Sequence, residues 1–338
     1  MTVGKVSVVV HGGAWGIPDS EKEGCLKGVH KACSEAYQML INGANAADAA
    51  QKAIEIMELD PIFECGVGAS TNASGYMELD ALIGDDKYNI GAVAGIRNFI
   101  HPIRVARAVR DKTGHILLIG RGANEFAELI GEKKVQTEDM LVGKGLALYH
   151  KLKEENAQKS VAQNLSEYAD VKANLFVDQK KQGNKILENG PSDTVGIVCK
   201  DREGNIIVAL STGGIPMKMP GRVGDTPQWG SGGYAEDGCG AAATGYGEDL
   251  IKVLMTKSMV DRVNVEGGSS ARRTQDQALE QVRVLESKVD GKGGVICLDK
   301  NGNPGIAFNT PRMAFSFCIE GDERGVVVGI EPEDLKKI

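Results

Sequence analysis

The sequence predicts a layered α+β protein, and three observations lead to this fold class. Strand-like and helix-like segments are grouped in blocks along the 338 residues instead of alternating strictly, which favours layered sheets and helices over a Rossmann-type sheet. The hydrophobic share of 42% and the charged share of 25% are ordinary for a globular chain. Glycine is abundant, with 44 residues, and aromatic residues make up only 5%, so we expect many tight turns and close backbone approaches.

The first block of predicted elements lies before residue 154. Within it, Ala47, Ala50, Ile54 and Met57 recur at helical spacing, and Pro102 suits the first turn of another helix. The predicted elements are a strand at 6–10, a glycine turn at 11–16, helices at about 20–43 and 46–59, strands at 76–82 and 90–96, a helix from 102, a strand at 116–119, and helices at 123–131 and 137–153.

The second block begins at Thr194, after a change in composition. From about Glu154 to Asn189, Lys, Gln, Asn and Glu dominate and the apolar residues keep no steady period, which predicts a solvated, flexible linker. The segments beginning at Thr194 and Asn205 then indicate a hairpin. The predicted elements are strands at 194–200 and 205–212 with a turn at 201–204, helices at 247–262 and 270–288, and strands at 294–299, 304–308 and 314–319.

Charge and hydropathy narrow the partners that we expect. The net charge of -7 argues against a nucleic-acid surface, because polyanions select basic patches. No apolar run approaches the roughly 20 residues needed to span a bilayer, and the N-terminal run is too short for a signal peptide. The seven cysteines are scattered, odd in number and free of CxxC motifs, which indicates a reducing compartment. We therefore expect a cytoplasmic protein that binds neither membrane nor nucleic acid.

Cofactor motifs are not found in the sequence. It contains no GxxxxGK[ST] segment, and its glycine-rich stretches lack the G-x-G-x-x-G context of a first βα turn. No group of His, Cys, Asp and Glu has the spacing of metal ligands. We therefore expect no cofactor and no catalytic metal.

Four segments of the second block are rich in glycine and small polar residues. Taken singly, each has an ordinary structural explanation: a threonine that opens a strand is a good β-former, Thr-Gly pairs mark turns, and an Arg three residues before an Asp forms a surface ion pair. Their order and spacing carry the functional interpretation. The segments are 192–196 (Ser-Asp-Thr-Val-Gly), 211–214 (Ser-Thr-Gly-Gly), 221–225 (Gly-Arg-Val-Gly-Asp) and 243–247 (Ala-Thr-Gly-Tyr-Gly).

In this order, the segments resemble the plant-type asparaginase and isoaspartyl peptidase family of N-terminal-nucleophile (Ntn) hydrolases, whose relatives include glycosylasparaginases and the threonine aspartase. The resemblance covers nearly the whole chain. Its further motifs are His11-Gly-Gly-Ala14, Asn72-x-x-Gly75-x-x-Glu78-x-Asp80-Ala81, Gly91-Ala-Val-Ala-Gly-Ile96, Pro102-Ile-x-x-Ala106-Arg107, Gly221-Arg-Val-Gly-Asp-Thr-Pro227 and Thr244-Gly-Tyr-Gly-Glu248.

A threonine nucleophile needs a base, because its hydroxyl is unreactive until a proton is removed. We expect no histidine near the four glycine-rich segments that carry the chemistry; the five histidines are His11, His30, His101, His115 and His150. A chain break before Thr194 would supply an α-amine, with an unperturbed pKa of roughly 7.7–8.0. The resemblance implies that the break is autocatalytic and lies between Asp193 and Thr194. It would leave an α subunit, 1–193, ending in the linker at about 154–193, and a β subunit, 194–338.

The resemblance also implies roles for individual residues. Thr212 would orient the Thr194 hydroxyl, and Asn72 would lie near the scissile bond. Thr244 and the Gly245 N–H would form an oxyanion hole. The substrate-binding residues would be Arg222 for the α-carboxylate and Asp225 for the α-ammonium, accompanied by Val223, Gly224, Thr244, Gly245, Tyr246 and Gly247.

The sequence departs from the family pattern in a few places. Asp193 stands where plant-type asparaginases usually have Gly, as in glycosylasparaginases and the threonine aspartase, and Ser192 stands where His is common. Gly213-Gly214 follows the asparaginases, whereas glycosylasparaginases usually have Asn-Gly. Asp225 argues against the threonine aspartase, which lacks this partner for an ammonium group.

The resemblance implies a four-layer αββα sandwich of the Ntn-hydrolase type, with residues 1–338 forming one domain and the mature αβ units forming a homodimer. The leading interpretation is an amidohydrolase that converts L-asparagine to L-aspartate and ammonia and cleaves β-aspartyl dipeptides. Two alternatives remain open: a glycosylasparaginase, and an uncleaved, non-catalytic homologue that acts as a scaffold. A structural monovalent cation at residues 63–68 also remains open.

Overall fold

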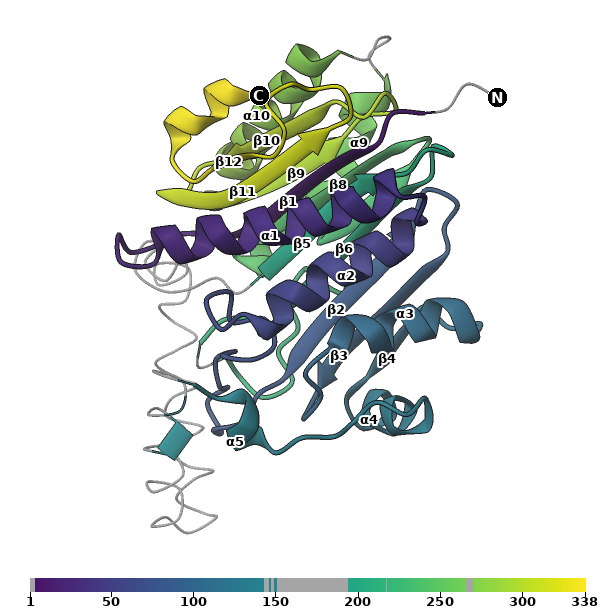
Figure 1. Cartoon of the computed structure of the whole chain (residues 1–338). Coiled ribbons are helices and arrows are strands. Elements are labelled where there is room, and N and C mark those ends of the chain that lie inside the picture. Colours follow the sequence, from purple (N-terminus) through teal and green to yellow (C-terminus); the bar gives the residue numbers. More distant parts are fainter. Residues whose placement is uncertain (1–3, 143–145, 147–148, 151–193, 217, 266–269) are drawn as a thin grey trace.

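The computed structural model describes residues 4–142, 146, 149–150, 194–216, 218–265 and 270–338. The predicted linker at about 154–193, including Asp193, lies outside the described residues, as does part of the helix predicted at 137–153. In the described residues the strands form two sheets, one of eight strands and one of four. Helices accompany both sheets (Figure 1), so the α+β class is confirmed.

The strands are β1 (Ser7–Trp15), β2 (Leu79–Asp85), β3 (Ile90–Ile96), β4 (Leu117–Ile119), β5 (Thr194–Lys200), β6 (Ile206–Thr212), β7 (Gly233–Glu236), β8 (Cys239–Gly245), β9 (Gly293–Leu298), β10 (Pro304–Phe308), β11 (Arg312–Ile319) and β12 (Val327–Gly329). The helices are α1 (Lys22–Ile41), α2 (Ala46–Leu59), α3 (Pro102–Lys112), α4 (Gly120–Leu129), α5 (Thr137–Met140), α8 (Gly247–Lys252), α9 (Met255–Val265), α10 (Ala271–Val289) and the 3-10 helix η1 (Pro332–Lys337).

The large sheet has the strand order β12-β11-β1-β5-β6-β2-β3-β4. All of its pairs are antiparallel except β3 with β4. The hairpin of β5 and β6 lies at its centre, and every residue of both strands is buried. Strand β1 pairs with β5 as far as His11, and its register against β11 shifts between His11 and Ala14. The glycine turn predicted at 11–16 is therefore an irregular end of this strand.

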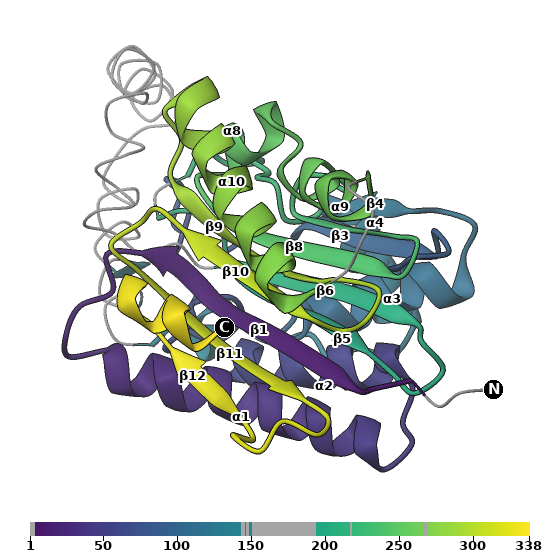
Figure 2. The same ribbon diagram turned by 90° about the horizontal axis from the view of Figure 1, so that it is seen from above.

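Three apolar clusters hold the layers together: one lies between each sheet and its helices, and one lies between the two sheets. Helix α1 lies against β1 and β11, α2 against β5 and β6, and α3 against β2 and β3. Helices α9 and α10 lie against the four-stranded sheet β10-β9-β8-β7. The two sheets contact each other through the third cluster. Figure 2 shows the two groups of helices on opposite sides of the pair of sheets.

Small residues allow the two sheets to approach. A Cβ atom on Gly240 would lie 2.7 Å from Cγ2 of Ile206, and one on Gly233 would lie 2.7 Å from Cδ1 of Leu210. The same residues explain why β7 and β8 were not predicted, because glycine and alanine are poor strand formers by propensity. These small residues are needed in β7 and β8 because larger side chains would not fit between the two sheets.

Other elements differ from the prediction for local reasons. The helix predicted at 247–262 is two helices, α8 and α9, because Leu254 takes a left-handed conformation with φ of 48°. The strand predicted at 76–82 begins only at Leu79 and continues to Asp85, because residues 71–78 form a loop held by hydrogen bonds to Asn72. None of the helices in the described part of the chain combines the length and apolar character needed to cross a bilayer.

The close contact between the sheets leads to a first prediction. Gly240→Ala should destabilise the fold by about 1–3 kcal/mol, because the added methyl group overfills the space beside Ile206, Val198 and Val208. Urea denaturation measures the change. The control is Gly114→Ala, because no atom lies within 4 Å of the added methyl group and the position is exposed. Equal stability of the two variants would contradict the packing account.

Candidate active site

Two threonines face each other at one end of the central hairpin. Thr194 is the first residue of β5 and Thr212 is the last residue of β6, and their Cα atoms are paired in the register. The Thr194 hydroxyl, in a residue only 5% exposed, donates to Oγ1 of Thr212 at 3.1 Å. Oγ1 of Thr212 also accepts the N–H of Gly214 at 2.9 Å. The Thr194 hydroxyl is therefore held in one orientation by a partner that is itself held by backbone.

A narrow cavity opens beside this threonine pair. It brings together the end of the hairpin, the loop that follows β6, and the end of β8. Six of the residues predicted from the sequence line it, whereas Val223, Thr244, Tyr246, Gly247 and Asn72 do not. The lining residues are Thr194, Thr212, Gly214, Ile215, Arg222, Gly224, Asp225, Thr226 and Gly245.

The end of β8 supplies Thr244 and Gly245. Thr244 is fully buried, and its Oγ1 accepts the N–H of Ala14 at 3.3 Å, so its own hydroxyl proton remains available to a ligand. Gly245 has φ of 145°, and a Cβ atom there would lie 2.6 Å from the backbone of Lys292 and Gly293. Only glycine fits at this position, and Gly245 is one of the residues that line the cavity.

Arg222 is held by a residue that the sequence interpretation did not assign. Its Nε and Nη2 donate to the two carboxylate oxygens of Glu248, at 3.0 and 2.7 Å. Burial acts to lower the pKa of Arg222, but the hydrogen bonds and charge of Glu248 outweigh it and raise the pKa. Glu248 was visible as the last residue of the Thr244–Glu248 motif, but the sequence does not indicate that it pairs with Arg222.

Asp225 presents an unpaired oxygen in the cavity wall. The residue is only 3% exposed, and its Oδ2 has no hydrogen-bond partner among the described residues. Burial raises the pKa of Asp225 to about 7, although the charge of Arg222 acts in the opposite direction. A Cβ atom on Gly247 would lie 2.9 Å from Oδ1 of Asp225 and 3.0 Å from Nη2 of Arg222. Gly247 therefore leaves room for both charged groups.

Two of the predicted substrate-binding residues, Val223 and Tyr246, are next to residues that line the cavity. Val223 follows Arg222 in the loop and is partly exposed. Tyr246 is the N-cap residue of α8 and is also partly exposed, and its backbone N–H donates to the carbonyl of Lys292. Both adjoin residues that line the cavity. Their contribution to ligand binding stays a prediction.

Asn72 is buried away from the cavity wall. Its Nδ2 donates to Glu78 at 2.9 Å, and its Oδ1 accepts the N–H groups of Ser74 and Tyr76. Glu78 in turn accepts the N–H of Gly221, the residue before Arg222. Asn72 is thus joined to the candidate site through Glu78. Its predicted place near the scissile bond stays a prediction, because Asp193 is outside the described residues.

The expectation that no histidine lies near the motifs is wrong. His11 of β1 is paired with Gly196 of β5, and its ring is packed so closely that a Cβ atom on Gly196 would overlap it. Burial lowers the pKa of His11 to about 3, although the adjacent backbone of Thr194 acts to raise it. The imidazole is therefore neutral near pH 7 and a weak base. Sequence distance concealed the contact, which arises because β1 pairs with β5.

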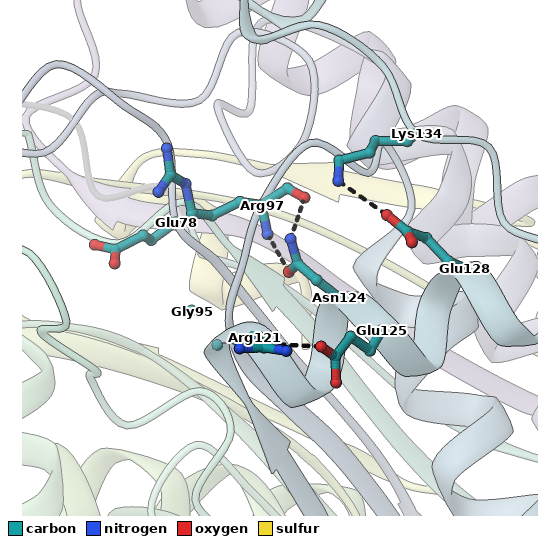
Figure 3. A pocket seen from close by; sticks show the side chains of 9 residues that line it. Glu78, Gly95, Arg97, Arg121, Asn124, Glu125, Glu128 and Lys134 are labelled. Carbon is teal, nitrogen blue, oxygen red and sulfur yellow. Dashed lines mark hydrogen bonds and ion pairs between the residues drawn. The ribbon is translucent and has the colours of Figure 1, made fainter.

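A second cavity opens on the large sheet's β3–β4 side, and Figure 3 shows the side chains around it. Its charged groups include the exposed ion pairs Arg121–Glu125 and Lys134–Glu128. The Arg97 guanidinium stacks on the ring of Tyr76, 3.6 Å from its centre. This cleft carries mixed, solvated charges and none of the threonines. In the described residues, no group of three or more His, Cys, Asp and Glu could hold a metal ion.

Fold and site together define a two-sheet α+β protein with a threonine-lined cavity, and comparison with known sequences agrees with this description. A sequence profile of the asparaginase family matches residues 4–328. The chain is 35% identical over 319 residues to an isoaspartyl peptidase/L-asparaginase of Danio rerio, covering 93% of this chain and 92% of that protein. It is 37% identical over 326 residues to a plant-type L-asparaginase of Pyrococcus abyssi, covering 94% and 97%. It is 38% identical over 299 residues to an isoaspartyl peptidase/L-asparaginase of Mus musculus, covering 88% of this chain and 82% of that protein. The chain belongs to the asparaginase family.

The environment of Asp225 predicts a pH-dependent effect on stability. Its pKa of about 7 in the folded protein is above its ordinary value of 3.8, so folding disfavours the ionised form. The resulting cost is absent below about pH 4, grows as the pH rises, and is complete above about pH 7. Asp225→Asn removes this cost and should stabilise the protein by about 1–4 kcal/mol at pH 8 and by less at pH 5.

Urea denaturation at the two pH values measures this effect. Both proteins should carry Thr194→Ala, so that a single uncut chain unfolds in each case. A stabilisation that is equal at pH 5 and pH 8, or a loss of stability at pH 8, would contradict the assignment of Asp225 as a buried carboxyl group with a raised pKa.

Proposed function

We propose that the protein is an amidohydrolase that cuts its own chain before Thr194, converts L-asparagine to L-aspartate and ammonia, and cleaves β-aspartyl dipeptides. The observation that carries this proposal is the oriented Thr194 hydroxyl, which lines one small cavity together with Arg222 and the unpaired carboxyl oxygen of Asp225. The names of the family members reported above support the substrate class.

Maturation starts from the Thr194 hydroxyl. Its oxygen attacks the carbonyl carbon of Asp193, the hydroxyl proton passes to the backbone nitrogen of Thr194, the peptide C–N bond breaks, and residues 1–193 become an ester on Oγ1 of Thr194. Water hydrolyses the ester, which frees the hydroxyl and leaves a carboxylate on Asp193. The hydrogen bond from Thr194 to Thr212 supports this step, because it aligns the attacking oxygen. The product has an α-amine and a hydroxyl on the same residue.

The mature α-amine then acts as the base. It takes the proton from Oγ1 of Thr194, and the oxygen attacks the side-chain amide carbon of the substrate. Negative charge that develops on the carbonyl oxygen is stabilised by the Thr244 hydroxyl and the Gly245 N–H, each worth about 3–4 kcal/mol in comparable sites. The protonated amine gives its proton to the leaving ammonia or peptide amine. Water then hydrolyses the β-aspartyl ester and restores Thr194.

Substrate recognition follows from the two charged groups of the cavity. Arg222 uses Nε and Nη2 for Glu248, so Nη1 is the nitrogen left to bind a carboxylate. Asp225 offers Oδ2 to an ammonium group, whose charge would also favour ionisation of the aspartate. A substrate with free α-carboxylate and α-ammonium groups must have its scissile amide on the side chain. Asparagine and β-aspartyl peptides satisfy this condition, whereas ordinary peptides do not.

The architecture and assembly of the mature protein are part of the proposal. The order of helices, large sheet, small sheet and helices supports the four-layer αββα sandwich of Ntn hydrolases, with 1–193 and 194–338 forming one domain. A homodimer of αβ units is supported by exposed apolar side chains around β4 and α4: Ile116, Leu117, Ile119 and Leu129. The seven cysteines are all buried and none forms a disulfide, which supports a reducing cytoplasmic location.

The glycosylasparaginase alternative is disfavoured by the backbone at Gly213. Glycosylasparaginases usually have asparagine at this position, but a Cβ atom on Gly213 would lie 2.7 Å from the carbonyl oxygen of Glu64 and 2.8 Å from Cβ of Ala69. The position therefore has no room for a side chain. Parallel assays with a β-aspartyl dipeptide and a glycosylasparagine separate the two activities, and faster turnover of the glycosylasparagine would favour the alternative.

The nucleophile has a direct test. Thr194→Ala should stay one intact chain and hydrolyse no β-aspartyl dipeptide, because the variant has neither the attacking oxygen nor a way to free an amine. Thr194→Ser keeps the hydroxyl and should still form two fragments. Denaturing electrophoresis and an ammonia assay measure the two effects. Fragments from Thr194→Ala would contradict the assignment, and a wild-type chain that stays uncut and inactive would favour the scaffold alternative.

A different outcome is expected for the carboxylate-binding residue. Arg222→Gln should still mature into two fragments, because self-cleavage needs no substrate carboxylate. Its kcat/KM for asparagine should fall by about 100-fold or more, mainly through KM, since a charge-assisted pair is lost. Steady-state kinetics on the cleaved variant measures the change. Unaltered KM would show that the carboxylate binds elsewhere.

A further inference from the structure

A third side chain stands in line with the two threonines. In the large sheet, Thr212 is paired with Thr194 on one side and with Asp80 of β2 on the other. Directly opposite residues of antiparallel strands point to the same face of a sheet. Adjacent strands are about 4.8 Å apart, so Asp80 lies on the face of the nucleophile at a distance of about 10 Å from Thr194.

Asp80 is a fully buried carboxyl group. Its Oδ1 accepts the N–H of Gly95 at 2.8 Å, and its Oδ2 has no hydrogen-bond partner among the described residues. Burial raises the pKa of Asp80, and the positive charge of Lys218 is the largest effect in the opposite direction. The proposed mechanism assigns no step to this group.

Lys218 brings a buried cation to the same place. It is only 3% exposed, and its Nζ donates to the carbonyl oxygen of Glu78 at 2.6 Å. A Cβ atom on Gly214 would lie 2.7 Å from this Nζ, and the N–H of Gly214 is the group that holds Oγ1 of Thr212. The ammonium therefore lies beside the backbone that orients the threonine pair.

Buried charges of opposite sign next to a reacting group are costly to keep and commonly tune its proton affinity. We propose that Asp80 and Lys218 are positioning residues of opposite charge that together set the basicity of the α-amine of mature Thr194. The cation disfavours the protonated amine and makes it available as a base, whereas the anion limits this effect. The inference rests on the proposed function, because the amine exists only after cleavage.

The size of the effect follows from Coulomb's law. At about 10 Å and an effective dielectric constant of roughly 20, one charge changes the pKa of the amine by about one unit. Other charged or titratable groups also surround Thr194, and the charge of Asp80 acts on two of them by raising the pKa values of Arg222 and Asp225. The surrounding groups are His11 of β1, Glu78 before β2, Arg222 and Asp225 of the loop after β6, and Glu248 of α8.

Two substitutions that remove charges of opposite sign test the proposal. The measurement is the pH dependence of kcat for asparagine, whose acid limb reports the amine in the enzyme–substrate complex, where the bound ammonium group keeps Asp225 ionised. Lys218→Gln should move the acid limb to higher pH by about one unit, and Asp80→Asn should move it to lower pH by a similar amount. Purely structural damage lowers the rate but does not move the limb in opposite directions.

Lys134→Gln is the matched control, because it removes a lysine charge from the exposed pair with Glu128 and should leave the profile unchanged. Wild-type-like profiles for both test variants, or shifts in one direction, would overturn the inference and leave the proposed function intact. If Lys218→Gln stays uncleaved, Lys218→Arg decides: restored cleavage supports the need for a cation, and its failure contradicts it. A wild-type enzyme without amide hydrolysis would overturn both proposals.

Discussion

The site depends on the alignment of Thr194 with Thr212 across the central hairpin. A shift of one residue between β5 and β6 would turn one of the two hydroxyls to the opposite face of the sheet. The register is secured by complete burial of both strands and by pairing with β1 and β2 on either side. Thr194 is the first residue of β5. The sheet therefore holds the nucleophile at the residue that would become the new chain start.

The charged side chains near this hairpin suit a ligand that carries both a carboxylate and an ammonium group. Glu248 holds Arg222 by two hydrogen bonds, while Asp225 has an oxygen without a partner. Keeping this carboxylate buried makes the empty site less stable than a neutral equivalent, and a bound ammonium group would offset the cost. The Asp80 carboxyl group is also buried, but the cation beside it is Lys218, which the protein itself supplies. Burial of these carboxyl groups lowers the stability of the fold, whereas their charges serve the site.

Local patterns allowed much of the fold to be predicted from the sequence. The central hairpin and α2 were expected at their observed bounds to within a residue, because their apolar periodicity is strong. Strands β7 and β8 were missed, since glycine and alanine are selected there by the gap between the sheets. The cavity residues Thr194, Thr212, Arg222, Asp225 and Gly245 could be anticipated from motifs. The contacts of His11, Glu248 and Asn72 could not, because they depend on which distant strands and loops become neighbours.

N-terminal sequencing of the purified, active protein tests the central claim most directly, because it identifies the residue that carries the free amine. The account predicts a second chain start that reads Thr-Val-Gly-Ile-Val, in an amount that rises in proportion to amide-hydrolysing activity as the precursor matures. Full activity in a protein whose bond between residues 193 and 194 is intact would contradict it.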